Sequence, residues 1–343
     1  MKYIINFVPH TGSGNLGDYI IVDSTIKILN KIFYGENIYF FNIATHQPLT
    51  SYHRKLIKLL IKNKVKMVKI VSGTNLFNLF YTPFSNLNSW KVNYLDIPYL
   101  KGIILFGVGT QIKEGKAKNS LKSFLEKVRT EYSKWFWRKI LNPDFPHMVR
   151  DQESVDLLRG LGLEGKNLGC PTLWFLTKEH CKEIPSKKSD AVITTLTAYN
   201  ADFKRDLKMF KILFEYYKKV YIWPQGIRDF LYLNKILKVI KYTPSVIPPR
   251  LEDYDRFLLS SKVDYVGTRL HAGIRALQHK KRTIVVSIDN RAKSFSRDFK
   301  IHSIERENIE KLPDLINSEF ETKISIPEKE IKDYLVRFKK LID

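Results

Sequence analysis

Short apolar runs alternate along this chain with longer segments whose apolar residues recur at helical spacing. In the first half, the runs expected to form strands are residues 3–8, 38–43, 67–71, 102–107 and 147–150. Between the first two of them, Ile21, Ile28, Leu29 and Ile32 share one face of a predicted helix. Strands of this length separated by amphipathic helices are typical of βαβ units, so the pattern predicts a parallel sheet covered by helices.

The same alternation starts again near residue 190. Strands are predicted at "DAVITTL", "KVYIW", "VDYVG" and "TIVVSI", with amphipathic helices between them. We therefore expect two Rossmann-like, doubly wound α/β domains, residues 1–175 and 176–343. The final segment, "PEKEIKDYLVRFKKLID", is predicted to be a helix that packs back on the first domain. Because ligands of such folds bind beyond the carboxyl ends of the strands, we expect the domains to face a shared cleft.

Composition narrows the class of protein. Of the 343 residues, 44% are hydrophobic and 27% are charged, as expected for a globular protein. No apolar run reaches the roughly 18 residues of a membrane-spanning helix, and no signal-peptide pattern opens the chain. The two cysteines, Cys170 and Cys181, form neither a CxxC pair nor a disulfide framework. These features predict a cytoplasmic protein. No metal-ligand spacing is visible, so no metal is expected.

The formal net charge of +23 is the unusual feature of the composition. Such a field attracts nucleic acid, anionic lipid surfaces and phosphorylated small molecules. No helix-turn-helix, zinc-finger or RNA-binding pattern is visible, so nucleic acid is not an expected partner. Two interpretations stay open: solvated lysines without a partner, or attraction to an anionic substrate or to the inner face of the cell membrane. The segment "YSKWFWRK" offers Trp135 and Trp137 either to a bilayer or to the core.

Residues 12–18, "GSGNLGD", have the spacing G-x-G-x-x-G between a predicted strand and a predicted helix. A dinucleotide-binding loop also needs an acidic residue at the end of the second strand, where "NIYFFNIATHQP" has none. No Gly-Lys-Ser/Thr follows, which excludes a Walker A loop. Two interpretations remain: Asp18 is only a helix cap, or Asn15 and Asp18 face the cleft and contact sugar hydroxyls, with Asp18 as a candidate base.

The most informative stretch is "VDYVGTRLHAGIRAL", residues 263–277. A buried strand is predicted to end at Gly267, Thr268 to be the N-cap, and Arg269 and His271 to lie in the first helical turn. Cations at a helix N-terminus oppose the helix dipole, so two of them there indicate a bound anion. Backbone N–H groups, a guanidinium and an imidazole together form a phosphate or carboxylate site. The alternative is an internal ion pair for Arg269 and a core position for His271.

Two further clusters follow predicted strands. In "MVRDQES", Arg150 follows a strand and Asp151 is a candidate cap, so Arg150 is expected to reach the same cleft or to pair internally with Asp151. After "TIVVSI", the segment "DNRAK" brings Arg291 and Lys293 to the carboxyl end of another strand. Both are candidate binding residues of the same cleft, on the side that would hold an anionic donor molecule, and a plain solvated loop is the alternative.

Together these segments resemble the polysaccharide pyruvyltransferase family. The matching segments are "GNLGD", "VRDQES", "GCPTLW", "WPQG", "TRLHAGIRAL" and "SIDNRAKSF", in the order found in the family. The resemblance implies a glycosyltransferase-B-like arrangement, with an acceptor-side first domain and a donor-side second domain. It implies transfer of the pyruvyl group of phosphoenolpyruvate, a co-substrate, to a hydroxyl pair of a surface polysaccharide or lipid-linked precursor, as a ketal. No other cofactor is implied.

The resemblance also implies roles for individual residues. Arg150, Arg269 and Leu270 correspond to donor-binding positions, and His271 to the acid or the phosphate-activating group. Asn15, Asp18, Gln111 and Gln225 become candidates for the acceptor, although "FGVGTQ" matches the family only loosely around Gln111. Two other classes stay open: a nucleotide-sugar glycosyltransferase of the same fold, and a non-enzymatic module that binds polyanions.

Overall fold

The computed structural model describes residues 2–110, 120–240 and 242–342. Contacts divide the chain into two compact units. Unit 1 contains residues 1–13, 21–171 and 327–343, and unit 2 contains residues 14–20 and 172–326. The predicted boundary at residue 175 is near this division. Residues 14–20 belong with the second half of the sequence, whereas residues 327–343, predicted to pack back on the first domain, belong with the first half.

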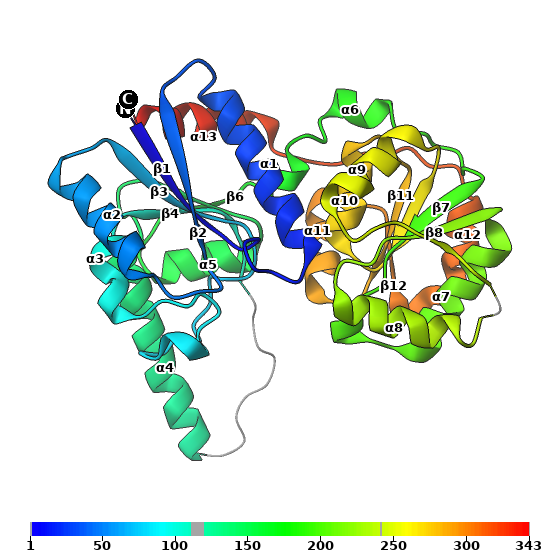
Figure 1. Cartoon of the computed structure of the whole chain (residues 1–343), viewed down its shortest axis with the longest axis horizontal. Coiled ribbons are helices and arrows are strands. Elements are labelled where there is room, and N and C mark those ends of the chain that lie inside the picture. The colour runs from blue at the N-terminus through cyan, green and yellow to red at the C-terminus, as the bar shows by residue number, and fades with distance from the viewer. Residues whose placement is uncertain (1, 111–119, 241, 343) are drawn as a thin grey trace. The chain divides into compact units, whose positions relative to one another are not determined.

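Unit 1 is built on a parallel sheet of six strands in the order β2-β1-β3-β4-β5-β6 (Figure 1). Its strands are β1 (Lys2–Val8), β2 (Ile38–Ala44), β3 (Met67–Ser72), β4 (Ile103–Val108), β5 (His147–Val149) and β6 (Gly165–Asn167). Its helices are α1 (Leu16–Ile32, whose first five residues belong to unit 2), α2 (Ser51–Lys62), α3 (Ile97–Leu100), α4 (Ser120–Ile140), α5 (Gln152–Gly160) and α13 (Glu328–Lys340).

Alternate residues of the strands in unit 1 face two different layers of helices. Leu105 of β4 packs in a core with α2, α4 and α5, whereas Phe106 points to the opposite face. There the Phe106 ring lies 5.5 Å from that of Phe338 on α13. Phe338 also contacts Phe33, the residue directly after α1, and Lys339 pairs with Glu36 at 2.6 Å. These contacts explain why the last helix belongs with the first half of the sequence.

Unit 2 is a second parallel sheet of six strands, in the order β12-β11-β10-β7-β8-β9. Its strands are β7 (Ala191–Thr194), β8 (Lys219–Ile222), β9 (Ser245–Val246), β10 (Asp264–Gly267), β11 (Thr283–Ser287) and β12 (Ser303–Glu305). Its helices are α6 (Lys178–Lys182), α7 (Phe203–Tyr216), α8 (Ile227–Leu237), α9 (Leu251–Ser260), α10 (Leu270–Gln278), α11 (Asn290–Phe299) and α12 (Leu312–Asn317). Short 3-10 turns complete the chain at Ser85–Leu87, Tyr94–Asp96, Pro171–Leu173, Ala198–Asn200 and Arg306–Lys311.

The strand order of unit 2 reverses between β7 and β10, as in Rossmann folds. Helices α7, α8 and α12 pack on one face of this sheet, and α9, α10 and the first turn of α1 pack on the other. Ile20 of α1 is buried there among Trp223, Tyr254 and Ala272. The start of the first helix is therefore a structural part of unit 2.

Candidate functional site

A pocket of about 370 Å³ opens in unit 2 at the carboxyl ends of β7, β8, β10 and β11. It lies where the strand order reverses, the usual ligand position in open α/β sheets. All of its lining residues belong to unit 2. They are Gly14, Asn15, Gly17, Tyr199, Gln225, Gly226, Ile227, Arg228, Asp229, Thr268, Arg269, Leu270, His271, Asp289 and Ala292.

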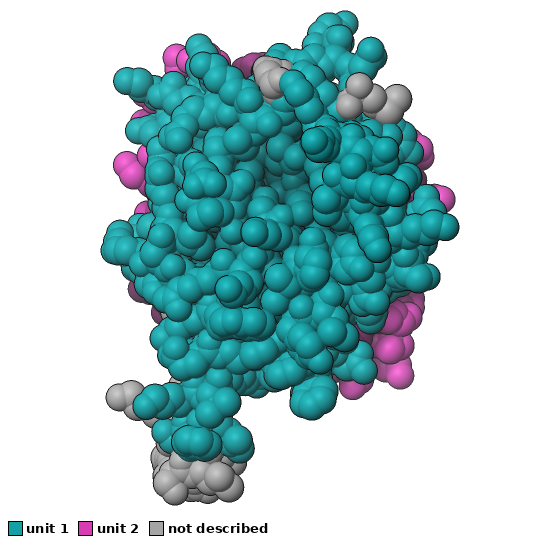
Figure 2. Space-filling model, turned by 90° about the vertical axis from the view of Figure 1, so that its left-hand side faces the viewer, with its two compact units in different colours: residues 1–13, 21–171, 327–343 teal, residues 14–20, 172–326 magenta. Residues whose placement is uncertain are grey.

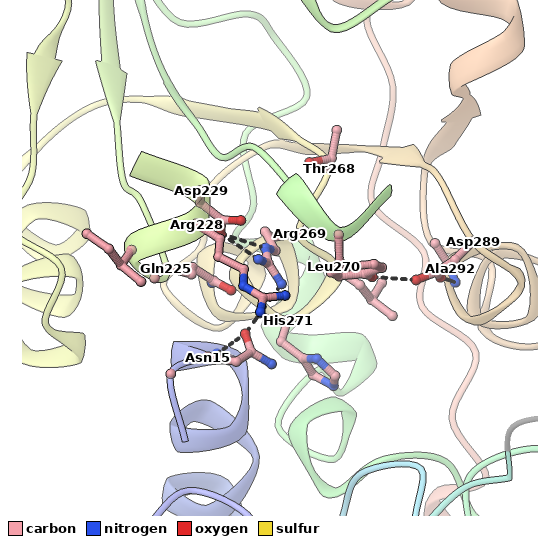
Figure 3. Close-up of a pocket in the computed structure, with 15 residues that line it drawn as sticks. Asn15, Gln225, Arg228, Asp229, Thr268, Arg269, Leu270, His271, Asp289 and Ala292 are labelled. Atoms are coloured by element: carbon pink, nitrogen blue, oxygen red, sulfur yellow. Dashed lines mark hydrogen bonds and ion pairs between the residues drawn. The ribbon is translucent and has the colours of Figure 1, made fainter. Parts of the chain in front are cut away.

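An ion pair crosses the back of the pocket. Nη2 of Arg269 lies 2.5 Å from Oδ2 of Asp229, and Nε lies 3.1 Å from the same oxygen. The Asp229 carboxylate is buried, and its Oδ1 accepts a hydrogen bond from the backbone N–H of Ala198 at 2.9 Å. In Figure 3 these two side chains point toward one another, with Asn15 on the side of α1. The Arg269 Nη1 reaches Asn15 Oδ1 at 3.5 Å.

The backbone before Arg269 is held by buried hydroxyl groups. The Tyr265 hydroxyl donates to the carbonyl of Arg269 at 2.7 Å and shares a hydrogen bond of 2.6 Å with Thr195 Oγ1. Burial raises the pKa of Tyr265 above its usual range, which keeps the phenol protonated. A Cβ atom at Gly267 would come within 2.6 Å of Thr195 Oγ1. The close approach of these two segments therefore requires glycine at position 267.

Two helices begin at the pocket without a side-chain cap. The N-cap residues of α8 and α10 are Gly226 and Arg269, and neither makes a side-chain cap hydrogen bond. Thr268, the expected N-cap of α10, instead bonds its hydroxyl to Thr197 Oγ1 at 2.8 Å. Uncapped N-termini present N–H groups and partial positive charge, so the pocket wall is suited to an anion.

Basic side chains lie in the first turns of both helices. Arg228 of α8 is exposed at the pocket, and among the described residues it has no ion-pair partner. His271 lies in the first turn of α10 and is only 9% exposed, with its ring centre 6.5 Å from that of Phe295. Among the residues that line the pocket, the negative charges of Asp229 and Asp289 offset the positive charges of Arg228 and Arg269. The partial positive charge of the two helix N-termini therefore largely decides how strongly the pocket attracts an anion.

A buried amide faces the same space. Gln225 is 2% exposed, and within the described part of the chain its Nε2 has no hydrogen-bond partner. Unsatisfied buried donors cost about 1–3 kcal/mol, so such an atom at a pocket indicates a ligand contact. Next to it, a Cβ at Gly226 would lie 2.3 Å from the carbonyl of Gly14. The glycine at 226 thus allows the start of α1 to pack directly against the loop after β8.

An aromatic residue covers the rim of the pocket. The guanidinium of Arg269 lies 5.3 Å from the centre of the Tyr199 ring, a cation–π contact. The Tyr199 hydroxyl donates to Asp289 Oδ2 at 2.7 Å, while Asp289 caps α11 through the N–H of Ala292. Tyr199 thereby links the loop after β7 to the loop after β11.

The structure brings five of the residues predicted from sequence into this pocket: Asn15, Gln225, Arg269, Leu270 and His271. Asn15 accepts the N–H of Gly17 at 3.2 Å, so it makes the capping contact that had been considered for Asp18. Asp18 lies half-buried in the first turn of α1 and is not part of the lining. Its role as a base stays a prediction.

Lys293 is placed elsewhere than expected. It does not line the pocket, because the turn of α11 directs it outward, where its ammonium pairs with Glu305 of β12 at 3.0 Å. Arg291 is on the same helix, and its side chain lies outside the described part of the structure. Gln111 also lies outside the described residues. The predicted roles of Arg291 and Gln111 therefore stay predictions.

Arg150 lies in unit 1, directly after β5. It is 2% exposed and packs over Gly109, with Nη2 bonded to Asn75 Oδ1 and Nε 4.0 Å from Asp151. Asp151 caps α5 through the N–H of Ser154 at 2.8 Å, as the sequence predicts. Burial raises the pKa of Asp151, although Arg150 opposes that shift. The predicted part of Arg150 in a donor site stays a prediction.

Sequence reasoning missed Arg228, Asp229 and Tyr199 as site residues. Arg228 and Asp229 follow "WPQG" after one intervening residue, Ile227, so their place shortly after a strand was the available signal. Tyr199 lies in a short 3-10 turn that has no recognisable pattern.

The described residues contain neither a candidate membrane span nor a candidate metal cluster. No helix there is long and apolar enough to cross a membrane, and no group of three or more His, Cys, Asp or Glu side chains could hold a metal ion. The two candidate membrane tryptophans of α4 differ. Trp137 is fully buried and donates its Nε1–H to the Asn78 carbonyl at 2.9 Å, so it belongs to the core, whereas Trp135 is 42% exposed.

Solved structures of low sequence identity share the fold. The S. aureus MnaA–UDP co-structure matches with a TM-score of 0.53 at 11% identity, covering 99% of this chain and 98% of that chain. The Methanocaldococcus jannaschii UDP-GlcNAc 2-epimerase in complex with UDP-GlcNAc and UDP matches with a TM-score of 0.51 at 14% identity, covering 97% and 99%. A UDP-glucosyltransferase from Polygonum tinctorium matches with a TM-score of 0.50 at 10% identity, covering 99% and 93%.

These likenesses confirm the predicted two-domain, Rossmann-like α/β fold of the glycosyltransferase-B-like type. No curated protein matches the chain. The family model described as "Polysaccharide pyruvyl transferase" matches residues 15–290, a span that holds every residue lining the pocket except Gly14 and Ala292. The chain therefore belongs to the polysaccharide pyruvyl transferase family.

Proposed function

We propose that this chain transfers the pyruvyl group of phosphoenolpyruvate to a saccharide, with the pocket of unit 2 as the donor site. One observation carries the proposal: in a member of this family, the uncapped N-termini of α8 and α10 meet beside Arg228 and Arg269. Phosphoenolpyruvate carries a phosphate and a carboxylate, and helix N-termini together with guanidinium groups suit both. In this assignment Arg228 and the N–H groups of α8 hold the phosphate.

The proposed reaction needs an acid at the donor and a stabilised leaving group. Protonation of the methylene carbon gives the adjacent carbon oxocarbenium character, and a saccharide hydroxyl forms a new C–O bond there. The bond between this carbon and the phosphate oxygen breaks, and attack by a second hydroxyl closes a ketal. Of the two hydroxyl protons, one returns to the acid and the other leaves with the phosphate. His271 is our candidate for that acid. Arg228 and the helix N-termini stabilise the charge that develops on the departing phosphate.

Gln225 and Asn15 are proposed to contact the acceptor. The Gln225 amide, which has an unpartnered N–H donor among the described residues, can donate to a hydroxyl oxygen, while the Asn15 side chain can accept from a hydroxyl. Asn15 also contacts Arg269 at 3.5 Å, which would couple the acceptor side of the pocket to the donor side. A lipid-linked saccharide is one candidate class of acceptor in this proposal.

A nucleotide-sugar donor is the second candidate. The same pair of helix N-termini would accept a diphosphate, and Tyr199 is an exposed ring at the rim on which a planar base could stack. This alternative predicts transfer of a sugar and release of a nucleotide, which distinguishes it from pyruvyl transfer.

The test is incubation of the full chain with phosphoenolpyruvate and a panel of free and lipid-linked saccharides. Phosphate release and the mass of the saccharide product are measured together. We expect both to depend on phosphoenolpyruvate and to fall by about 10²-fold or more in His271→Gln. Sugar transfer from a nucleotide sugar, with no phosphate release from phosphoenolpyruvate, would favour the second candidate instead.

A further inference from the structure

Helix α4 of unit 1 carries an apolar stripe that its own core does not use. Its C-terminal half is anchored, since Phe136, Trp137 and Ile140 are fully buried in the unit 1 core. Its N-terminal half stands away from the rest of unit 1, as Figures 1 and 2 both show at the bottom of the view. Among the side chains of that half that the structure describes, the exposed apolar ones are Phe124, Leu125 and Val128, at 63%, 57% and 51%.

These side chains form one surface. At 3.6 residues per turn, Phe124, Val128 and Trp135 follow one another along a single face of α4, and Leu125 lies beside them. We call these four residues the apolar stripe. Single exposed apolar residues are ordinary, but four along one projecting helix indicate a contact surface. The Tyr132 ring, 5.6 Å from that of Trp135, continues this surface.

Basic residues accompany the apolar stripe along α4. Lys127, Lys134 and Arg138 recur along one side at spacings of seven and four residues, and Lys139 lies one turn beyond Trp135 on the face of the stripe itself. We call these four residues the basic flanks. Glu131 pairs with Lys134 at 2.7 Å and is the one acidic residue of α4 that lies among them. The face that carries the apolar stripe therefore has an excess of positive charge.

The combination of the apolar stripe and the basic flanks favours one kind of binding partner over another. A second copy of the chain would bring two sets of basic flanks together in a protein of net charge +23, which is unfavourable. An anionic bilayer complements both features, because Phe, Leu and Trp enter the interface while lysines contact phosphate headgroups. We propose that the projecting half of α4 docks on an anionic membrane surface, with the apolar stripe in the headgroup layer. This inference stands independently of the proposed function.

The test is co-sedimentation of the full chain with phosphatidylcholine vesicles that contain or lack phosphatidylglycerol. Two double variants probe the stripe and its flanks: Phe124→Ser/Val128→Ser and Lys127→Glu/Lys139→Glu. Matched controls in unit 2 are Leu231→Ser/Leu259→Ser and Lys204→Glu/Lys211→Glu, all at exposed positions. Circular dichroism melts establish that each variant is folded. Because all substituted side chains are exposed, the melting temperatures are expected to stay within a few degrees.

We expect binding only to vesicles with phosphatidylglycerol, and weaker binding at high salt. The lysine variant should partition at least about fivefold more weakly for each reversed charge, and the apolar variant about tenfold more weakly, with both controls near wild type. The proposal is overturned if wild type does not sediment with anionic vesicles, or if the α4 variants and their controls lose binding equally. Reversible dimerisation abolished by the apolar variant, without vesicle binding, would assign the stripe to a second copy and also overturn it.

Discussion

Arg269, the N-cap residue of α10, and Asp229, in the first turn of α8, face one another across the back of the pocket, with Nη2 2.5 Å from Oδ2. The carboxylate is held from its other side by the Ala198 N–H, so it can neither rotate nor leave without breaking two contacts. The guanidinium is thereby aimed along the pocket wall and toward Asn15. Asp229 is thus a positioning residue, which acts through Arg269.

The first prediction concerns that positioning. Asp229→Asn keeps an oxygen for the Ala198 N–H but loses the charge that orients Arg269. We expect the KM for phosphoenolpyruvate to rise about tenfold with a smaller change in kcat, and the free energy of unfolding to fall by about 1–3 kcal/mol, since Arg269 is partly exposed. Steady-state kinetics and urea unfolding measure the two effects. An unchanged KM in a folded variant would show that the pair has only a structural role.

The second prediction concerns the exposed cation of α8. Arg228→Ala removes a guanidinium that has no ion-pair partner among the described residues, so we expect no loss of stability. Donor affinity should nevertheless fall about tenfold, because a charge-assisted contact to phosphate is lost. Lys235→Ala on the same helix is the control for net charge, since Lys235 is exposed and lies outside the pocket lining. Equal effects of the two variants would indicate a long-range field rather than a contact.

The third prediction separates stability from function at Gln225. Replacing it with methionine keeps the length of the side chain and removes a buried N–H that lacks a partner in the described structure. The free energy of unfolding should stay the same or rise, by up to about 1–3 kcal/mol. Turnover with a saccharide acceptor should drop at least about tenfold. If Gln225→Met is clearly destabilised, the amide has a partner within the free protein, and the argument for a ligand contact fails.

The fourth prediction is a pH dependence of stability in unit 1. Burial lowers the pKa of His147 to about 4. The neutral ring accepts the Leu105 N–H at Nδ1, and its Nε2 lies 3.0 Å from the Asn142 carbonyl. Below the ordinary value of 6.5 the unfolded chain binds a proton that the folded chain does not, so stability falls as pH drops from 6.5 to about 4. The total loss is about 3 kcal/mol.

The measurement is urea unfolding of wild type and His147→Gln across this pH range. Carboxylates titrate in both proteins, so their contribution to the pH dependence of stability cancels in the difference between the two curves. The variant is expected to lose less stability than wild type as the pH falls through the window. Parallel curves would mean that His147 is protonated in the folded state.

Much of the fold was readable from the sequence because its central strands are buried on both faces. Short continuous apolar runs between amphipathic helices, such as residues 103–108, are typical of buried parallel strands. The missed strands β6, β9 and β12 are edge strands of two or three residues, whose half-exposed positions carry no apolar run. Nothing in the local pattern shows that Leu16–Ile20 pack in unit 2, because that depends on the distant Trp223 and Tyr254.

Site residues could be predicted where a side chain able to bind an anion directly follows a strand. Arg269 and His271 follow a strand and open a helix, so their place in the pocket could be expected. Lys293 met the same criterion and still lies outside, because one residue along a helix turns a side chain by about 100°. The ion pair between Arg269 and Asp229 joins positions far apart in sequence, and no local pattern predicts it.

The most direct test of the account is a calorimetric titration of phosphoenolpyruvate into wild type and Arg228→Ala, without acceptor. We predict one binding site per chain in wild type and an affinity about tenfold lower in the variant, while UDP competes weakly or not at all. Absence of phosphoenolpyruvate binding, or binding that is unchanged by the loss of Arg228, would contradict the assignment of this pocket as the donor site.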